Sequence, residues 1–424
     1  MQNTNPGEPS KDMGTYAIYA LLVASYFTAC LLRSSSSVVL PRLAESVGMA
    51  SGAIGFISSM YFYGYTFAQP HSGTLCDRKG PLLSCALGML LLAVGVFIFA
   101  NSTTTSALAF GRFLTGLGAG PTFCGVLVYQ ARAFNPAQYP LLTGMTVSLG
   151  HLGGVFAISP MGAALAQWGH WGTHIGIAIA ATCMGGFFLA VRRRDPISSA
   201  PPPKKTGGLR AIIDGFKMIR RSKKLSQLTA LWGVVMVLQL TLIGLWGVSW
   251  LTDGGTLSES QARFCMSAGG VGVLIGAFSS GLKGGTWTET PSVMRRFGLL
   301  LCAVLLAFIL ATPSFGMSVM LPLSIAFGVL VGSLNVLSNA TLHRIVDSSL
   351  IGTAMGTINT VLFFAVLVAQ WLSGLMLEFV LDRFSQKGDG FAYSAVFLTI
   401  LLLSLVAVAY FCRIKDYDRE QALE

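Results

Sequence analysis

The residues best suited to chemistry in this sequence are charged side chains within apolar segments, and Arg33 is the clearest of them. It lies in the stretch LLRSSSSVVLP (31–41), which otherwise has the composition of a membrane-buried segment. A charged side chain at bilayer depth costs about 3 kcal/mol on insertion scales, so it usually faces a bundle interior and has a function. A guanidinium group suits carboxylate or phosphate, which it binds through paired hydrogen bonds. Arg33 therefore indicates an anion site.

A counter-charge for Arg33 is missing from the apolar segments. All 17 Asp and Glu residues fall in loops, tails or the ends of expected spans. Arg112 is a second arginine within an apolar segment, and the two together predict a positively charged cavity that an external anion neutralises. Two alternatives stay open. Arg33 lies about eight residues from the end of its span, so its side chain could extend to the membrane surface, and Arg112 could serve packing or conformation instead of binding.

The composition places these arginines in a polytopic membrane protein. Hydrophobic residues make up 53% of the 424 positions and charged residues 11%, with 49 glycines and a mean hydropathy of +0.67. Soluble domains carry about 25% charged residues. Runs of the length that crosses a bilayer, about 20 residues, recur along the whole chain. The twelve expected spans are 15–40, 52–74, 82–101, 106–131, 139–166, 171–191, 229–251, 262–282, 295–312, 317–341, 352–377 and 391–412.

A Pro-, Lys- and Arg-rich segment, 192–228, divides these spans into two sets of six. We predict an N-terminal tail (1–14), a six-helix bundle (15–191), a linker (192–228), a second six-helix bundle (229–412) and a C-terminal tail (413–424). The tail 1–14 is polar and has no cleavage site after a short apolar core, so we expect the first span to be retained. The part of the linker from Leu209 to Leu225 has an apolar and a basic face, which predicts an amphipathic helix on the membrane surface. A simple tether and a regulatory element are both compatible with it.

The distribution of basic residues predicts the orientation. With the N-terminus inside, 22 of the 28 Lys and Arg residues are cytoplasmic, four are outside, and Arg33 and Arg112 lie within spans. This bias places both termini in the cytoplasm. Topology and anionic lipids explain the net charge of +11, so we expect no nucleic-acid partner. The eight cysteines lack metal-binding spacing, and no nucleotide-binding or hydrolase motif occurs, so we expect no cofactor, no metal and no enzymatic activity.

Other polar residues recur at helical spacing within the spans and could line the same cavity. They could equally form hydrogen bonds and close packing between helices. His151 has the side chain best suited to carry a proton near neutral pH, although a structural role is also open. These further candidates for substrate binding are Tyr61, Tyr65, His151, Gln239, Trp246, Asn335 and Asn339.

The loop after the second span reads SGTLCDRKGPLLS, in which Gly73 and Gly80 permit a tight turn and Asp77 and Arg78 can bind neighbouring helix ends. This loop resembles the G-x-L-x-D-R-x-G signature of the major facilitator superfamily. The stretch GRFLTGLGAG (111–120) resembles a second pattern of that family, R-x-x-x-G-x-G, through Arg112. The resemblance implies twelve helices in two pseudo-symmetric bundles, with the first motif stabilising one conformation of the gate. The corresponding loop of the second half, GLKGGTWTETPS, lacks the Asp-Arg pair.

Arg33 and Pro41 together resemble the R-x7-P pattern of the organophosphate:phosphate antiporter and anion:cation symporter branches. This resemblance implies that Arg33 binds the anionic group of a substrate. Span 7 lacks the basic residue of the antiporters, and Gly118 and Ala119 stand where many symporters have an acid, so substrate and coupling stay open.

We therefore expect a monomeric secondary transporter of a small organic anion (carboxylate, sugar acid or phosphate ester) in a bacterial inner membrane. It would work by alternating access, through exchange or proton symport. The alternatives are a transporter of amphipathic drugs, siderophores or peptides with the same fold, and a transporter-like sensor.

Overall fold

The computed structural model describes residues 13–134, 138–193, 209–282, 291–312, 314–346, 351–384, 386 and 388–413. Within these ranges the regular structure is helical and contains no β-strand. Nine helical segments of the described residues are long and apolar enough to cross a membrane. The prediction of an all-α polytopic fold is therefore confirmed.

The helices fall into two halves joined by α8. The first half contains α1 (Met13–Ser34), α2 (Ser36–Val47), α3 (Ser51–Lys79), α4 (Pro81–Ala100), α5 (Thr105–Ala133), α6 (Tyr139–Phe156) and α7 (Ser159–Val191). The connecting helix is α8 (Leu209–Arg221). The second half contains α9 (Lys223–Leu238), the π-helix η1 (Gln239–Trp246), α10 (Gly247–Thr252), α11 (Glu259–Leu282), α12 (Pro291–Ala311), α13 (Met317–Ile345), α14 (Ile351–Arg383) and α15 (Asp389–Phe411).

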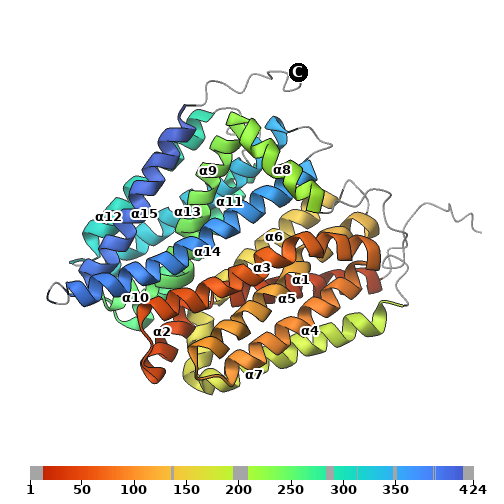
Figure 1. The fold of residues 1–424 in the computed structure, drawn as a ribbon, viewed down its shortest axis with the longest axis horizontal. Coiled ribbons are helices and arrows are strands. Elements are labelled where there is room, and N and C mark those ends of the chain that lie inside the picture. The colour runs from red at the N-terminus through yellow and green to blue at the C-terminus, as the bar shows by residue number, and fades with distance from the viewer. Residues whose placement is uncertain are drawn as a thin grey trace, which may run out of the picture.

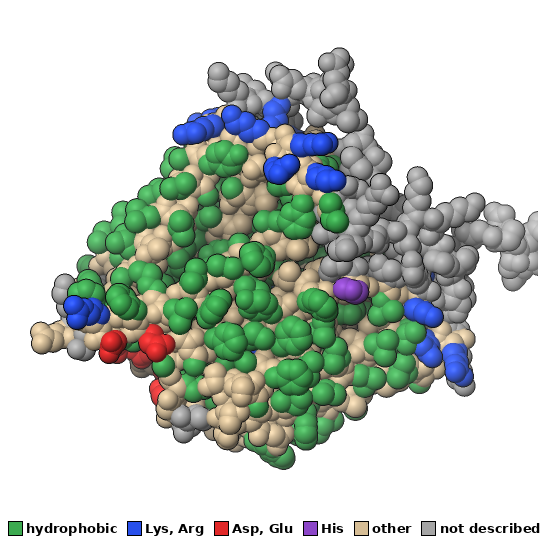
Figure 2. Space-filling view, viewed as in Figure 1, with side chains coloured by type: hydrophobic (Ala, Val, Ile, Leu, Met, Phe, Trp, Pro, Cys, Tyr) green, Lys and Arg blue, Asp and Glu red, His purple; other side chains and the backbone are tan. Residues whose placement is uncertain are grey.

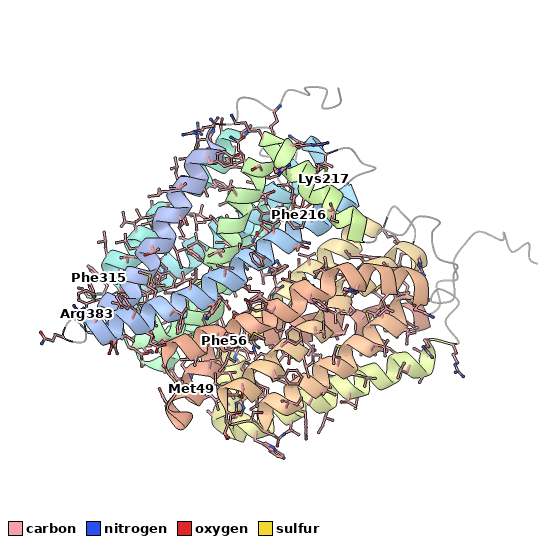
Figure 3. The ribbon with its side chains drawn as sticks, viewed as in Figure 1. Met49, Phe56, Phe216, Lys217, Phe315 and Arg383 are labelled. Carbon is pink, nitrogen blue, oxygen red and sulfur yellow. The ribbon has the colours of Figure 1, made fainter. Side chains whose placement is uncertain are left out.

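The two halves lie side by side, with α3 and α14 running along their boundary (Figure 1). Helix α8, which carries Phe216 and Lys217, lies at one end of the molecule, and Phe315 and Arg383 lie toward the other (Figure 3). We call the end with Phe216 and Lys217 the linker end. We call the end with Phe315 and Arg383 the Arg42 end, after the arginine described below. Helix α8 packs on the second half, because Gly215 lies directly against the side chain of Thr357 in α14.

The surface has the pattern of a membrane protein. Hydrophobic side chains cover the face between the two ends, while Lys and Arg side chains gather at the linker end and acidic ones toward the Arg42 end (Figure 2). Large apolar side chains such as Phe97, Phe278 and Leu310 are more than half exposed. In water this exposure would be unfavourable, but it is expected of side chains that contact lipid.

Glycines allow helices in each half to approach closely. In the first half, Gly116 of α5 lies against the backbone of Tyr61 in α3. In the second half, Gly332 of α13 lies against the backbone of Val273 in α11 in a similar way. Such small-residue contacts are the usual means of helix association in membranes.

Two of the spans are irregular in ways that the sequence did not predict. The first span is interrupted at Ser35, between α1 and α2. The seventh contains η1, an eight-residue π-helical segment between α9 and α10. Irregular turns of this kind within helices often occur at functional sites.

Some predicted boundaries were wrong. The predicted span 139–166 is divided between α6 and the beginning of α7, and the next loop is reduced to a break at Gly169, whose φ of +69° suits a residue without Cβ. The amphipathic helix ends at Arg221, not at 225, because Ser222 caps a new helix by accepting a hydrogen bond from the Leu225 amide. The span that was expected to begin at 229 therefore begins at Lys223.

Candidate functional site

A small cavity lies between the two halves, and we call it the Arg33 cavity. Its volume is about 30 Å³, which is far below the size of a typical ligand pocket, about 300–1,000 Å³. An organic anion could therefore enter only when the halves move apart. The cavity is lined by Arg33, Ser34, His151, Gly154 and Val155 of the first half and by Gln239, Leu240, Ile243, Gly244, Gly270 and Val273 of the second.

Arg33 is half-buried in the last turn of α1 and has weak partners. Its Nη2 donates to the Cys30 thiol at 3.5 Å, and its guanidinium carbon lies 5.9 Å from the centre of the Phe363 ring. Its Nε is buried without a hydrogen-bond partner. Among the described residues no carboxylate forms an ion pair with Arg33. The guanidinium thus retains donor capacity at the wall of the cavity.

Arg112 is bound differently, although it is also intramembrane. It is 4% exposed, donates from Nη1 to the Leu32 carbonyl at 2.7 Å and from Nη2 to the Ser36 hydroxyl at 2.6 Å. These acceptors stand on either side of the break at Ser35, and its guanidinium also lies 5.1 Å from the Tyr61 ring centre. Arg112 therefore braces the interrupted span and does not line the Arg33 cavity, which supports the conformational alternative over the predicted substrate contact.

The predicted aromatic residues form a packed layer next to Arg33. The Tyr61 hydroxyl donates to the Ala29 carbonyl at 2.8 Å, and its ring stacks on Tyr65 at 6.2 Å between centres. The Tyr65 ring meets Phe363 edge-on at 4.8 Å. Both tyrosines are buried and neither lines the cavity. In this structure they are packing residues, and Tyr65 contacts the Phe363 ring that lies next to Arg33.

His151 and Gln239 line the same cavity as Arg33, His151 from the first half and Gln239 from the second. His151 lies on α6 and Gln239 begins η1. The Gln239 side-chain oxygen accepts from Asn335 Nδ2 at 3.0 Å, and Asn335 Oδ1 accepts from the Trp232 indole at 2.9 Å. These hydrogen bonds orient the Gln239 side chain. Asn335 therefore does not line the cavity itself but positions a residue that does.

Two other predicted ligands lie elsewhere. The Trp246 side chain is 1% exposed and donates to the Ser373 hydroxyl at 2.9 Å, so it joins η1 to α14. Asn339 is half-buried on α13 and does not line the cavity. Sequence reasoning missed the glycine lining at Gly154, Gly244 and Gly270. The only sequence feature that could have indicated these lining residues is the high glycine content of the spans, and close helix packing explains that content equally well.

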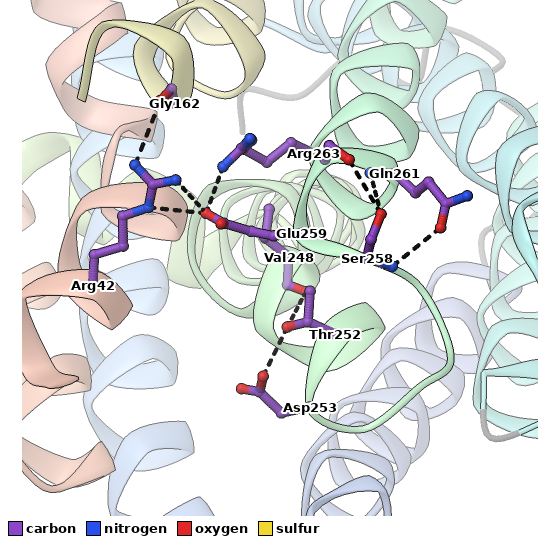
Figure 4. Close-up of polar contacts among 10 residues, drawn as sticks. Arg42, Gly162, Val248, Thr252, Asp253, Ser258, Glu259, Gln261 and Arg263 are labelled. Atoms are coloured by element: carbon purple, nitrogen blue, oxygen red, sulfur yellow. Dashed lines mark hydrogen bonds and ion pairs between the residues drawn. The ribbon is translucent and has the colours of Figure 1, made fainter. Parts of the chain in front are cut away.

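The halves are fastened together at the Arg42 end. Arg42 of α2 donates to Glu259 of α11 from Nε at 2.9 Å and from Nη2 at 2.8 Å, and Arg263 binds the same Glu259 oxygen (Figure 4). The Gly52 amide of α3 also donates to Glu378 of α14 at 3.0 Å. These contacts close the boundary between the halves at that end.

This arrangement of two bundles around an interfacial cavity agrees with the comparisons. A family profile described as Major Facilitator Superfamily matches residues 22–370. This chain belongs to the Major Facilitator Superfamily. It is therefore a membrane transporter of that superfamily, and the predicted family resemblance is confirmed.

Solved structures of superfamily transporters share its fold. A bacterial homolog of the human lysosomal transporter Spinster, in an inward-facing and unoccupied conformation, superposes with a TM-score of 0.75 at 12% identity over 95% of this chain and 97% of that one. The nucleoside transporter NupG superposes with a TM-score of 0.73 at 14% identity over 94% and 100%. At these identities the likeness concerns the fold alone.

Sequence relatives of this major facilitator match over short segments. The probable sulfoacetate transporter SauU of Cupriavidus necator is 28% identical over 149 residues, which are 34% of this chain and 33% of that protein. The quinolone resistance protein NorA of Staphylococcus aureus is 30% identical over 88 residues, or 21% and 23%. The matched segments thus span a third or less of these relatives.

The superfamily loop motif is only partly visible. Helix α3 continues through Gly73, so the expected tight turn at that residue is wrong. The turn is made by Gly80, whose φ of +87° favours glycine. The side chains of Asp77 and Arg78 lie outside the described residues, so their gating role stays a prediction.

Proposed function

We propose that this major facilitator is a secondary active transporter of a small organic anion, with Arg33 as the residue that binds the anionic group. The observation that carries this proposal is a guanidinium at the wall of a cavity between the halves, without a carboxylate partner among the described residues. An intramembrane cation of this kind needs a negative charge. A carboxylate, sugar acid or phosphate ester would supply it.

Alternating access follows from where the cavity lies. Because residues of both halves line it, rocking of one half against the other would expose the cavity first to one side of the membrane and then to the other. The bound anion would lower the cost of burying Arg33 while both sides are closed. Movement of the loaded transporter would therefore be easier than movement of the empty one.

Two modes of coupling are compatible with the site. Exchange of one anion for another needs only Arg33. In proton symport, an anion on Arg33 would also offset the charge of a protonated His151, since both side chains line the same cavity. Proton uptake would then depend on anion binding. Transport driven by an imposed pH gradient distinguishes the two modes.

The packing of the aromatic residues favours an anion over an amphipathic drug, whereas the relatives include one named for sulfoacetate transport and one named for quinolone resistance. The Cupriavidus necator relative is named for the transport of sulfoacetate, which is an anion. A transporter of drugs, siderophores or peptides would be expected to have aromatic side chains in its cavity wall. Trp246 is instead buried against Ser373, and neither Tyr61 nor Tyr65 lines the cavity. We further propose a monomer in a bacterial inner membrane with both termini cytoplasmic, so that the Arg42 end faces outward.

A ligand screen on purified protein tests the role of Arg33. The probes are succinate, gluconate, glycerol 3-phosphate and sulfoacetate, with glycerol and choline as neutral and cationic controls. We expect an anion to raise the Tm of the wild type. Arg33→Gln should weaken its binding by at least about 30-fold, because the buried anion loses its charge partner.

Two variants make this test specific. Arg33→Lys keeps the charge but loses the planar fork, so its affinity should fall between those of wild type and Arg33→Gln. Arg383→Gln removes an exposed arginine at the Arg42 end and should bind like wild type. Equal stabilisation of wild type and Arg33→Gln by every anion would overturn the proposal, as would stabilisation by choline or glycerol alone.

A further inference from the structure

One carboxylate at the Arg42 end is shared by two arginines from opposite halves. Arg42 reaches a single Glu259 oxygen through Nε and Nη2, and Arg263 reaches the same oxygen from one turn further along α11 (Figure 4). A third Arg42 nitrogen, Nη1, donates to the Gly162 carbonyl of α7 at 3.4 Å. The geometry is that of a carboxylate held in a clamp of two guanidinium groups.

The clamp has an excess of positive charge in acidic surroundings. Two cations face one carboxylate, and their side chains are only 31% and 16% exposed for Arg42 and Arg263, against 47% for Glu259. Other charged residues at this end include the acids Asp253 and Asp389, which lie near each other, Glu378 beside Gly52, and the exposed Arg383 (Figure 3). The clamp therefore keeps a net positive charge that can attract an anion over a short range in salt.

The clamp also stands directly along the chain from the Arg33 cavity. Arg42 follows Arg33 by nine residues on the same interrupted span, which is about 13 Å at helical rise. Arg263 precedes Gly270 of the cavity wall by seven residues on α11, or about 10 Å. The two spans that carry the clamp arginines thus both reach the cavity, where the first span contributes Arg33 and α11 contributes Gly270.

We infer that Arg42 and Arg263 form a capture site for the anionic substrate, and that Glu259 occupies this site while the entrance is closed. The inference rests on the proposed anion transport. When the halves separate, Arg42 moves with the first half and loses Glu259, which stays beside Arg263 on α11. The carboxylate, sulfonate or phosphate of the substrate then takes the place of Glu259 between the arginines before it passes to Arg33.

The experiment measures uptake from the Arg42 side and from the linker side in oriented proteoliposomes, with the four anions named above as probes. Arg42→Gln and Arg263→Gln should each raise KM from the Arg42 side by about two- to fivefold, the range of a partly exposed ionic contact. Glu259→Gln should lower that KM, because it removes the competing carboxylate. KM from the linker side should not change.

The direction of these changes separates a binding site from a simple latch. A latch that only holds the halves together is broken by any of the three substitutions, so all three would shift KM in the same direction. Opposite shifts for the arginine and glutamate variants, reduced at high ionic strength, are expected of a capture site. Arg383→Gln, which removes a charge from the same end outside the clamp, should leave KM unchanged.

Each negative result has a distinct meaning. If no probe binds the wild type, or if Arg33→Gln binds as well as the wild type does, the anion proposal and the capture site fail together. If binding depends on Arg33 but KM from the Arg42 side is unchanged in Arg42→Gln and Arg263→Gln, the capture site alone is refuted. A common direction of change in all three clamp variants also refutes it and leaves a mechanical latch.

Discussion

The substitution Gly116→Ala should destabilise the first half, because α3 and α5 touch through their backbones at this residue. An added Cβ would overlap the Tyr61 carbonyl oxygen and lie 2.7 Å from the carbonyl carbon of Tyr61, whereas ordinary contact begins at 3.4 Å. The helices must therefore separate by at least about 0.7 Å, since no side-chain rotation can relieve a clash with backbone. Overpacking of this kind costs about 1–3 kcal/mol, and a backbone clash belongs at the upper end.

The same displacement should reach the cavity. Tyr61 bonds to Ala29 of α1 and lies under Arg112, so movement of its backbone disturbs the brace at the break in the first span. The assay is thermal unfolding in detergent with and without the stabilising anion. Gly144→Ala is the matched control, because no heavy atom lies within 4 Å of its added Cβ. If both variants unfold at the same temperature and bind alike, the proposed backbone contact does not exist.

Two further substitutions test the surroundings of the site. Asn335→Leu should cost about 1–3 kcal/mol of stability and weaken anion binding several-fold, because it strands the Trp232 indole and releases Gln239. Unfolding and titration of this variant check both effects, and unchanged affinity would show that Gln239 does not contact the anion. The pKa of Asp253 is raised by partial burial and, to a smaller extent, by the charge of Asp389. The folded state therefore loses stability as pH rises through this pKa. Asp253→Asn should raise the Tm relative to wild type at pH 7, and the difference should disappear below about pH 4. A difference in Tm that does not change with pH would contradict the raised pKa of Asp253.

The sequence was sufficient to predict most of the fold, because hydropathy is a property of consecutive residues. A span is recognised by its own composition, without knowledge of its neighbours. Boundaries failed where a local cap decided them, as at Ser222, or where a single glycine replaced a loop, as at Gly169. Neither residue changes the hydropathy of its surroundings enough to be noticed.

The break at Ser35 had a weak signal in the sequence. Four serines follow Arg33, and serine hydroxyls can compete with the helix for backbone carbonyls. The structure contains two such bonds, from Ser35 to Leu32 and from Ser37 to Ser34. Serine is nevertheless common in membrane helices, so the pattern alone could not locate an interruption. The π-helix η1 had no signal of its own.

Contacts between residues far apart in the chain were beyond sequence reasoning. Arg42 and Glu259 are separated by 217 positions, and the link from Ser58 to Gln370 in α14 spans 312. Nothing local to either residue identifies its partner. No sequence feature therefore indicated the arginine clamp.

The two intramembrane arginines show how packing distinguishes residues that look equivalent in sequence. Arg112 donates hydrogen bonds from Nη1 to the Leu32 carbonyl and from Nη2 to the Ser36 hydroxyl. The break in the first span leaves both acceptors available. Among the described residues, Arg33 has only a thiol at 3.5 Å and an aromatic ring at 5.9 Å, while Nε is without a hydrogen-bond partner in both arginines. Charge-assisted hydrogen bonds lower the cost of a buried cation far more than a thiol does. The unmet requirement for an acceptor therefore lies at Arg33, next to the cavity, and a mobile anion is the partner that can satisfy it during part of a transport cycle and leave in the rest.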